Sequence, residues 1–248
     1  MKARLDQLLV SRSLCESREM ARRLILAGEV RVHGVANPKP GLQVPTDVVI
    51  EVKEMPKYVG RGGLKLEKAL DEFRIDPMEW TVLDIGASTG GFTDCLLQRG
   101  AIKAYTLDVG TNQLAWKIRS DPRVVAREQF NARYLGPDDL PVKVDLIVID
   151  VSFISLTLIL GPAFSVLKPE GSVVCLIKPQ FELTRELVGK GGVVREPGLR
   201  EVAVEKIRRH VTEDLAKEWR GVVASPISGA DGNQEFLAWL GNPSASAS

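Results

Sequence analysis

Short apolar runs alternate with segments of helical periodicity from Trp80 to the end of the chain. The apolar runs are continuous, which is typical of strands that are buried on both faces of a sheet. Because helical segments separate most of these runs, the order predicts an α/β fold with a mostly parallel sheet and helices on both faces. The predicted strands are WTVLDIG, KAYTLDVG, RVVA, VDLIVID, SVVCLIK and segments near 219–225 and 234–240. The predicted helices are GFTDCLLQRG, NQLAWKIRS, SFISLTLILGPAFSVL and a segment near 198–215.

The first 55 residues follow a different pattern. Leu5 and Leu8 recur at helical spacing, and SREMARRLILAGEV predicts a second amphipathic helix with Ser17 as its N-cap and Gly28 as its stop. Two β-prone runs, VRVHG and DVVIEV, come next and are separated by the Pro/Gly-rich loop NPKPGLQVP. This pattern predicts a small α+β domain at residues 1–55.

The segment KEMPKYVGRGG separates the two patterns. Pro56 and three glycines disfavour helix here, and a helical pattern resumes at Leu64. We therefore expect a linker at residues 56–63 and the α/β domain at residues 64–242. The remaining residues, 243–248, are small and polar and predict a disordered tail.

One apolar run, VDLIVIDVSFISLTLIL, contains a carboxylate at Asp150. Residues 146–164 come close to the length of a membrane span, but Asp150 would lie in the hydrocarbon core at a cost of several kcal/mol. We interpret the run as a buried strand followed by an apolar helix that ends at Gly161-Pro162. Asp150 then lies at the carboxyl end of a strand, where open α/β sheets place their chemistry.

Composition fits a reduced, globular protein. The 248 residues suffice for two modest domains, and 26% charged with 44% hydrophobic residues argues against disorder. Cys15, Cys95 and Cys175 are odd in number and outside any metal-binding spacing, so we expect no metal site. The amino-terminal residues are too polar for a signal peptide, and we expect a cytoplasmic protein without a membrane segment.

Positive charge is concentrated near the N-terminus. Residues 1–68 contain 13 Lys/Arg and 8 Asp/Glu, which favours a polyanionic partner. Arg18, Arg22 and Arg23 share one face of the predicted second helix. Guanidinium groups can bind phosphate in a bidentate manner without reading bases, whereas an ordinary solvated helix face is the alternative interpretation.

A glycine-rich turn, VLDIGASTGGFTD, joins a predicted strand to a predicted helix. Gly86, Gly90 and Gly91 permit close approach of a ligand to the backbone, Asp84 lies near the strand end, and Asp108 ends the next strand, where an acidic side chain takes ribose hydroxyls. The residues alone allow NAD or S-adenosylmethionine. Because the turn is not G-x-G-x-x-G, we favour S-adenosylmethionine as the cofactor.

Three further stretches carry polar residues beside predicted strand ends. RGGLKL contains Lys65, LIKPQFE ends a strand at Lys178, and GNQEFL opens the last strand at Glu235. Asp150 and Lys178 are expected at the ends of neighbouring strands, beside the cofactor. This arrangement favours catalysis over three unrelated surface charges.

These motifs together resemble a known family. They are YVGRGGLKLEKAL, LDIGASTGGFTDCLL, DVGTNQL, DVSFISL, LIKPQFE, GKGGVVREP and SPISGADGNQEFL. In this order they resemble the TlyA (haemolysin A) family, whose catalytic domain is an FtsJ-like methyltransferase. The resemblance implies a Rossmann-like sheet of seven strands and methylation of cytidine 2′-hydroxyls in ribosomal RNA. It also implies partners that are ribosomal RNA or ribosomal subunits, and it leaves the subunit, the nucleotide and the oligomeric state open.

The resemblance also implies particular residues. The catalytic tetrad corresponds to Lys65, Asp150, Lys178 and Glu235. The cofactor residues correspond to Asp84, Gly86, Ser88, Gly90, Gly91, Asp108 and Asn131, with Phe130 where a smaller polar residue is expected. Residues 4–34 resemble the RNA-binding domain named after ribosomal protein S-four, with RNA-binding candidates Arg4, Arg18, Arg22 and Arg23.

The tetrad predicts a division of roles. A ribose hydroxyl must lose its proton as it attacks a methyl group in line, so we assign Lys178 as base or alkoxide stabiliser and Asp150 as the group that orients it. Lys65 and Glu235 are expected to position the hydroxyl and the tetrad. Three alternatives remain at this stage: a membrane-active haemolysin, a non-catalytic RNA-binding protein and a pseudouridine synthase.

Overall fold

The structure, a computed structural model, describes residues 1–15, 17–53, 56–189, 191–229 and 231–243. The chain divides into two compact units, Met1–Pro56 and Lys57–Ser248, and each is described by itself. Apart from residue 243, the tail predicted at residues 243–248 lies outside the described residues.

The first unit is the expected small α+β domain. Its elements are β1 (Lys2–Arg4), α1 (Leu5–Ser11), α2 (Arg18–Leu26), β2 (Val30–Val32), β3 (Gln43–Pro45) and β4 (Ile50–Val52). Ser17 is the N-cap of α2, and its hydroxyl accepts a hydrogen bond of 3.2 Å from Met20 N. Gly28 follows the helix with φ +74°, a conformation that suits glycine. Both features agree with the sequence pattern.

One strand pair of this unit differs from the prediction. β3 lies within the segment predicted as a loop, and it pairs antiparallel with β1, which had no sequence signal of its own. Strands of three residues are too short to show an alternating pattern, and Pro45 is allowed because β3 is an edge strand of a two-stranded sheet. The predicted pair, β2 and β4, is present and antiparallel.

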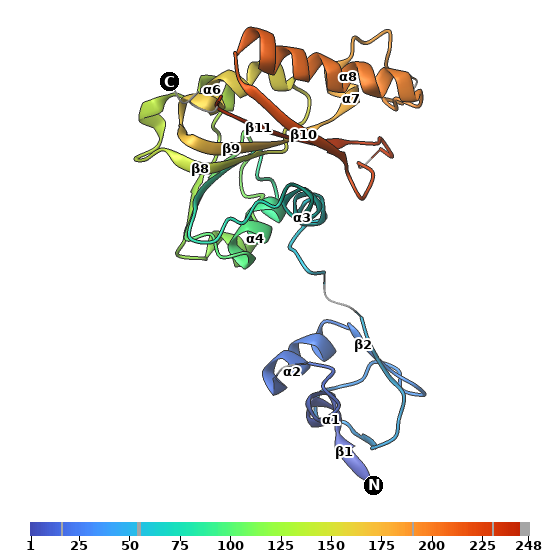
Figure 1. Ribbon diagram of the computed structural model, residues 1–248. Helices are drawn as coiled ribbons and strands as arrows, with labels where there is room; N and C mark the ends of the chain where they lie inside the picture. The colour runs from blue at the N-terminus through green and yellow to red at the C-terminus, as the bar shows by residue number, and fades with distance from the viewer. Residues whose placement is uncertain (16, 54–55, 190, 230, 244–248) are drawn as a thin grey trace. The chain divides into compact units, whose positions relative to one another are not determined.

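The second unit contains a sheet of seven strands in the order β10-β11-β9-β8-β5-β6-β7 (Figure 1). The strands are β5 (Thr81–Ile85), β6 (Lys103–Leu107), β7 (Val124–Arg127), β8 (Val144–Ile149), β9 (Leu167–Ile177), β10 (Glu218–Ala224) and β11 (Phe236–Gly241). Neighbouring strands from β9 to β7 are parallel, whereas β11 runs antiparallel to both of its neighbours, β9 and β10. The expected mostly parallel, seven-stranded sheet is confirmed.

Helices cover both faces of this sheet (Figure 1). The helices are α3 (Gly62–Phe73), α4 (Gly91–Gln98), α5 (Trp116–Arg119), α6 (Leu160–Ser165), α7 (Pro179–Glu182) and α8 (Pro197–Arg209), followed by a π-helical turn at His210–Asp214. Side chains alternate between the two cores: in β8, Ile147 and Ile149 pack with α6 and α8, whereas Leu146 and Val148 pack with α3 and α4. This alternation decides which residues meet at the ends of the strands.

Two predicted helices are shorter than expected. The helix predicted at NQLAWKIRS is limited to Trp116–Arg119. The helix predicted after β8 is a 3-10 turn at Leu156–Leu158 followed by α6. Its predicted end at Gly161-Pro162 is wrong, because both residues lie in the first turn of α6. Proline is tolerated there since amides of the first turn have no partner within the helix.

The predicted linker at residues 56–63 is part of the second unit from Lys57 onward. Tyr58 is buried against Gly63, where a side chain would collide with the tyrosine ring. Val59 N donates a 2.9 Å hydrogen bond to Asp94 Oδ2 in α4. This packing holds the start of α3 against α4, and Gly63, one of the glycines that suggested a linker, allows the close contact.

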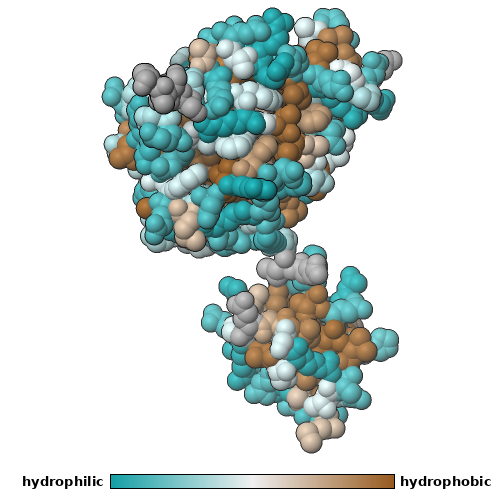
Figure 2. All heavy atoms as spheres, viewed as in Figure 1, coloured by the Kyte–Doolittle hydropathy of each residue, from teal (hydrophilic) through white to brown (hydrophobic). Residues whose placement is uncertain are grey.

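The apolar strand that precedes Asp150 is buried, as expected. All side chains of β8 except that of Asp145 are buried, and no helix of the described segments is long and apolar enough to cross a membrane. Figure 2 shows hydrophilic residues over much of the visible face of the second unit, with hydrophobic residues scattered between them. Isolated apolar residues on a surface are ordinary in globular domains.

Candidate active site

Strand alternation brings Asp150 and Lys178 to one side of the sheet. Each follows a parallel strand, β8 or β9, and the two strands are neighbours. Val148 and Leu176, two positions earlier, face the core that contains α3. Asp150 and Lys178 therefore emerge on the same face as α3, at the carboxyl edge of the sheet.

Glu235 reaches the same edge because β11 is antiparallel. Phe236, the first residue of β11, pairs with Ile177, the last residue of β9, so the start of β11 lies beside the end of β9. Glu235 is 2% exposed, and its Oε2 accepts a 2.5 Å hydrogen bond from Lys65 Nζ of α3. The structure thus joins Lys65 and Glu235 in a buried ion pair.

Lys178 forms the second ion pair of the tetrad. Its Nζ lies 2.6 Å from Asp150 Oδ1, without the alignment of a hydrogen bond, and donates a 2.8 Å hydrogen bond to Ser152 Oγ. The side chains of Lys178 and Asp150 are 11% and 22% exposed. Two anchors hold the ammonium in one orientation while the pair remains accessible from the cavity above it.

All four tetrad residues line one polar cavity of about 320 Å³. Its other lining residues are Arg61, Gly62, Gly86, Ala87, Ser88, Thr89, Gly91, Phe92 and Ser152. The expected tetrad is therefore assembled at one place, from α3, the ends of β8 and β9, and the start of β11.

A second cavity of about 310 Å³ adjoins the first, and the two share Gly86, Ser88, Asp150 and Ser152. Its remaining walls are mainly apolar, with three polar side chains at Asp108, Gln113 and Asn131. The apolar lining residues are Ile85, Leu107, Val109, Phe130, Ala132, Val151, Phe153, Ile154 and Ile159, with Gly86 at the junction. The mainly apolar second cavity suits a nucleoside, and we call it the nucleoside cavity. The polar first cavity suits a polar methyl acceptor, and we call it the acceptor cavity.

The glycine-rich turn shapes the junction of the cavities. Gly86 has φ +83°, and a β-carbon there would lie 2.4 Å from the carbonyl oxygen of Asp150, so only glycine fits. Ser88 also adopts positive φ, at +47°, and its amide donates a 2.7 Å hydrogen bond to Asp108 Oδ2. Asp108 Oδ1 accepts a second amide, from Gly110, which fixes the carboxylate at the end of β6.

These residues fit S-adenosylmethionine. Asp108 can accept ribose hydroxyls, the apolar walls can enclose the adenine, and Asn131 offers an amide at the rim. Phe130, which departs from the expected polar residue, lines the cavity and lies beneath the guanidinium of Arg127, 3.9 Å from its ring centroid. An aromatic ring is an effective stacking surface for a base, so this departure is compatible with adenine binding.

Two predicted cofactor residues line neither cavity. Gly90 begins α4 with φ +91° against Leu114 and Ile118. Asp84 is fully buried, and its Oδ2 accepts hydrogen bonds from the amide and hydroxyl of Thr93. Burial raises the pKa of Asp84 to about 7, and the charges of Asp150 and Asp108 act in the same direction. Asp84 therefore stabilises the glycine-rich turn through Thr93 and does not face either cavity.

The predicted RNA-binding arginines divide into two groups. Arg4 and Arg18 contact the buried carboxylate of Asp6, and these ion pairs lower the pKa of Asp6 to about 2. Arg22 and Arg23 are exposed on α2, where they and Arg18 line a surface hollow. Arg4 and Arg18 therefore have a structural partner, whereas Arg22 and Arg23 present their charge to solvent.

Three residues of the site had no signal of their own in the sequence. Ser152 accepts a hydrogen bond from Lys178, Arg61 lines the cavity that contains the tetrad, and Phe153, which is 91% exposed with φ +63°, lines the second cavity. Ser152 and Phe153 lie in DVSFISL and Arg61 in YVGRGG, so the motifs marked the segments but not the roles. Within the described ranges, no group of three His, Cys, Asp or Glu side chains could hold a metal ion.

The fold and the paired cavities define the class: an α/β transferase with a nucleoside hollow beside a charged acceptor hollow. Residues 58–242 match the model of the FtsJ-like methyltransferase family, and residues 3–47 match the S4 domain. The chain belongs to the FtsJ-like methyltransferase family.

Several known proteins are similar over nearly the whole chain. The 16S/23S rRNA (cytidine-2'-O)-methyltransferase TlyA of Mycobacterium tuberculosis is 44% identical over 96% of this chain and 90% of its own length. Hemolysin A of Brachyspira hyodysenteriae is 46% identical over 95% of this chain and 98% of its own. A solved hemolysin structure from Streptococcus thermophilus is 44% identical, covers 99% of this chain and 92% of its own, and superposes with a TM-score of 0.72.

Proposed function

We propose that this protein transfers a methyl group from S-adenosylmethionine to a ribose 2′-hydroxyl of ribosomal RNA, with cytidine as the target nucleotide. The observation that carries the proposal is the tetrad in the acceptor cavity, which meets the nucleoside cavity at Asp150. Lys65, Asp150, Lys178 and Glu235 line the acceptor cavity, and Asp150 also borders the nucleoside cavity. The Mycobacterium relative, whose name states this reaction, supports the choice of substrate.

Lys178 and Asp150 are placed to act on the hydroxyl. The cofactor supplies a methyl group on a sulfonium, and a hydroxyl oxygen must approach it in line. Asp150 and Ser152 fix Lys178 Nζ at the junction, where it can take the hydroxyl proton or stabilise the developing alkoxide. Holding the acceptor in line can by itself lower the barrier by several kcal/mol.

Lys65 and Glu235 give the acceptor cavity its fixed wall. Their ion pair is nearly excluded from water, so each charge depends on the other for stabilisation. Glu235 Oε1 and the ammonium of Lys65 can also bind the ribose beside the reacting hydroxyl. We assign Lys65 and Glu235 to positioning the substrate, and we assign proton transfer to Lys178.

The first unit is proposed to bind RNA backbone. Arg22 and Arg23 are exposed on one helix, and such guanidinium groups contact phosphate without selecting bases. Phe153, which is exposed and lines the nucleoside cavity, offers a flat surface for a base of the substrate. We place the reaction in the cytoplasm, where ribosomal subunits are available.

The test is tritiated methyl transfer from S-adenosylmethionine to isolated small and large ribosomal subunits, followed by mapping of ribose methylation. Incorporation at a cytidine 2′-oxygen in either subunit is the expected result. Incorporation on a base, or none into either subunit or its naked RNA, would contradict the proposal. Calorimetry with S-adenosylhomocysteine and with NAD checks the cofactor separately, and only the former should bind.

A further inference from the structure

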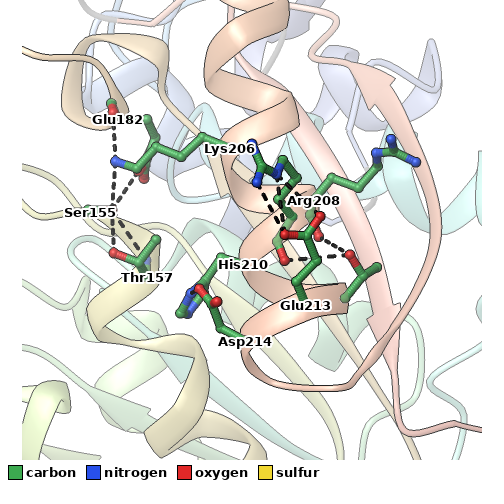
Figure 3. A network of polar contacts seen from close by, with 10 residues as sticks. Ser155, Thr157, Glu182, Lys206, Arg208, His210, Glu213 and Asp214 are labelled. Carbon is green, nitrogen blue, oxygen red and sulfur yellow. Dashed lines mark hydrogen bonds and ion pairs between the residues drawn. The ribbon is translucent and has the colours of Figure 1, made fainter.

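Glu182 is a buried carboxylate that lines neither cavity, and its side chain forms its hydrogen bonds and its ion pair outside the tetrad. Its side chain is 2% exposed. Oε1 accepts a 2.8 Å hydrogen bond from Leu156 N, and Oε2 accepts one of 2.5 Å from Ser155 Oγ. Lys206 Nζ of α8 lies 3.2 Å from Oε2 and donates a 2.7 Å hydrogen bond to the carbonyl oxygen of Glu182 (Figure 3).

This clasp, formed by Glu182, Ser155, Leu156 N and Lys206, joins three segments. Glu182 ends α7, the short helix that begins directly after Lys178. Ser155 and Leu156 belong to the loop that leaves β8 at Asp150. Figure 3 shows the Lys206 side chain extending from α8 to Glu182 and Ser155. The clasp therefore ties the segment after Lys178 to the segment after Asp150.

The loop between Asp150 and Ser155 forms part of the active site. Asp150 and Ser152 border both cavities and hold Lys178, and Phe153 lies 5.1 Å from Phe181 of α7, centroid to centroid. Phe153 keeps a positive φ of +63°, which costs on the order of 1 kcal/mol for a bulky residue and needs support from its surroundings. The clasp can provide this support, because it holds the loop at Ser155, five residues after Asp150.

We propose that Glu182 is a positioning residue for methyl transfer, with Lys206 as its charge partner. The proposal rests on the proposed function of the tetrad. On one side of the loop, Asp150 and Ser152 fix the ammonium of Lys178. On the other side, the clasp fixes the loop itself, so the distance from Lys178 to the cofactor cavity depends on Glu182.

The physical reason is geometric. Glu182 accepts from a buried amide and a partly buried hydroxyl while it pairs with the Lys206 ammonium, and only a carboxylate can do all three. A glutamine has one accepting oxygen. With that oxygen on Leu156 N, its amide nitrogen would lie at the Oε2 position and face the Lys206 ammonium as a second donor, so the clasp would rearrange and the loop would shift. A displacement of about 1 Å at a catalytic group can reduce the rate by about 100-fold.

The test compares full-length Glu182→Gln and Lys206→Met with the wild type. We expect Glu182→Gln to lower kcat at least tenfold at saturating RNA and cofactor, and Lys206→Met to lower kcat by a smaller factor. Affinity for S-adenosylhomocysteine, measured by calorimetry, should change less than threefold, because Asp108 and the glycine turn are untouched. Lys206→Arg should restore most of the activity. Glu205→Gln, which removes an exposed ion pair with Arg208 on the same helix, is the matched control and should leave kcat unchanged.

Thermal melting separates positioning from loss of fold. If Glu182→Gln does not melt cooperatively, Lys206→Met and Ser155→Ala carry the test, since each removes one polar side chain of the clasp and leaves the buried carboxylate in place. Folded variants with kcat within twofold of the wild type would overturn the positioning role. A fall in kcat that is matched by an equal fall in cofactor affinity would also overturn it. A wild type that transfers no methyl to ribosomal RNA would instead refute the proposed function, together with this inference.

Discussion

Lys65 Nζ and Glu235 Oε2 lie 2.5 Å apart, although 170 positions separate the two residues in the chain. Their side chains are 10% and 3% exposed, so water stabilises each charge only weakly. Transfer of two ions from water into such an environment has a large desolvation cost, which only their mutual contact offsets. The pair therefore makes α3 and the start of β11 depend on each other at the wall of the acceptor cavity.

Removal of one partner should be costly. We expect Glu235→Ala to lower the free energy of unfolding by about 3–5 kcal/mol, because it leaves the Lys65 ammonium buried without a partner. Urea denaturation measures the change. Lys68→Ala, which removes an exposed ion pair with Glu72 on the same helix, should cost less than about 1 kcal/mol. Equal effects of the two substitutions would show that burial does not set the strength of the Lys65–Glu235 pair.

Lys178→Ala should separate catalysis from cofactor binding. The ammonium lies at the junction of the cavities, whereas the cofactor cavity is built from other side chains. We expect methyl transfer to fall at least 100-fold while the Kd for S-adenosylhomocysteine changes less than threefold. Radiometric transfer and calorimetry measure the two quantities. Near-wild-type turnover would show that Lys178 has been given the wrong role.

The sequence could predict the sheet because the sheet follows from a simple periodicity, whereas the family resemblance implied the tetrad and periodicity only placed some of its members at strand ends. Continuous apolar strands separated by helices predicted the parallel arrangement, and Asp150 and Lys178 follow strands directly. Glu235 also follows this logic, since an antiparallel strand begins where its parallel neighbour ends. A residue at the end of a strand can therefore be placed without knowledge of its contacts.

Residues that act through loops could not be placed in this way. Ser152 and Phe153 owe their roles to a turn with positive φ, which a hydrophobic pattern does not encode. Glu182 ends a motif that the sequence analysis used only for Lys178, and its contacts come from a loop and a helix 24 or more positions away. Periodicity identifies the faces of elements, whereas such contacts depend on how loops pack.

Asp108 should control affinity for the cofactor. Two backbone amides fix its carboxylate at the end of β6, inside the nucleoside cavity. Asp108→Ala removes the acceptor for ribose hydroxyls and leaves the amides of Ser88 and Gly110 without their partner. We expect the Kd for S-adenosylhomocysteine to rise at least tenfold, which corresponds to about 1.4 kcal/mol. Asp138→Ala, at an exposed site outside the cavity, serves as the control. Unchanged affinity in Asp108→Ala would place the nucleoside elsewhere.

Asp84 should make stability depend on pH. Its pKa of about 7 in the folded protein lies above the ordinary value of about 4, so the folded state binds the proton more tightly than the unfolded state. Stability should therefore fall as the pH rises from about 4 to 7 and level off above that range. Asp84→Asn removes this contribution, and its stability relative to the wild type should rise with pH by on the order of 1–3 kcal/mol. Urea titrations at pH 5 and pH 8 measure the difference, and a difference that is constant with pH would contradict the assignment.

The basic face of α2 makes a prediction about salt. Arg22 and Arg23 are exposed, whereas Arg18 is held by Asp6, so the first two are free to displace counterions from RNA. Each phosphate contact contributes about 0.7–0.9 to the slope of log affinity against log salt concentration. Replacing both arginines by alanine should therefore weaken RNA binding and reduce the slope by about 1.4–1.8. Fluorescence anisotropy with an rRNA fragment at several salt concentrations measures both quantities. Arg208→Ala, an exposed arginine of the second unit paired with Glu205, is the control. A weaker affinity with an unchanged slope would mean that these side chains read shape or bases and do not neutralise phosphate.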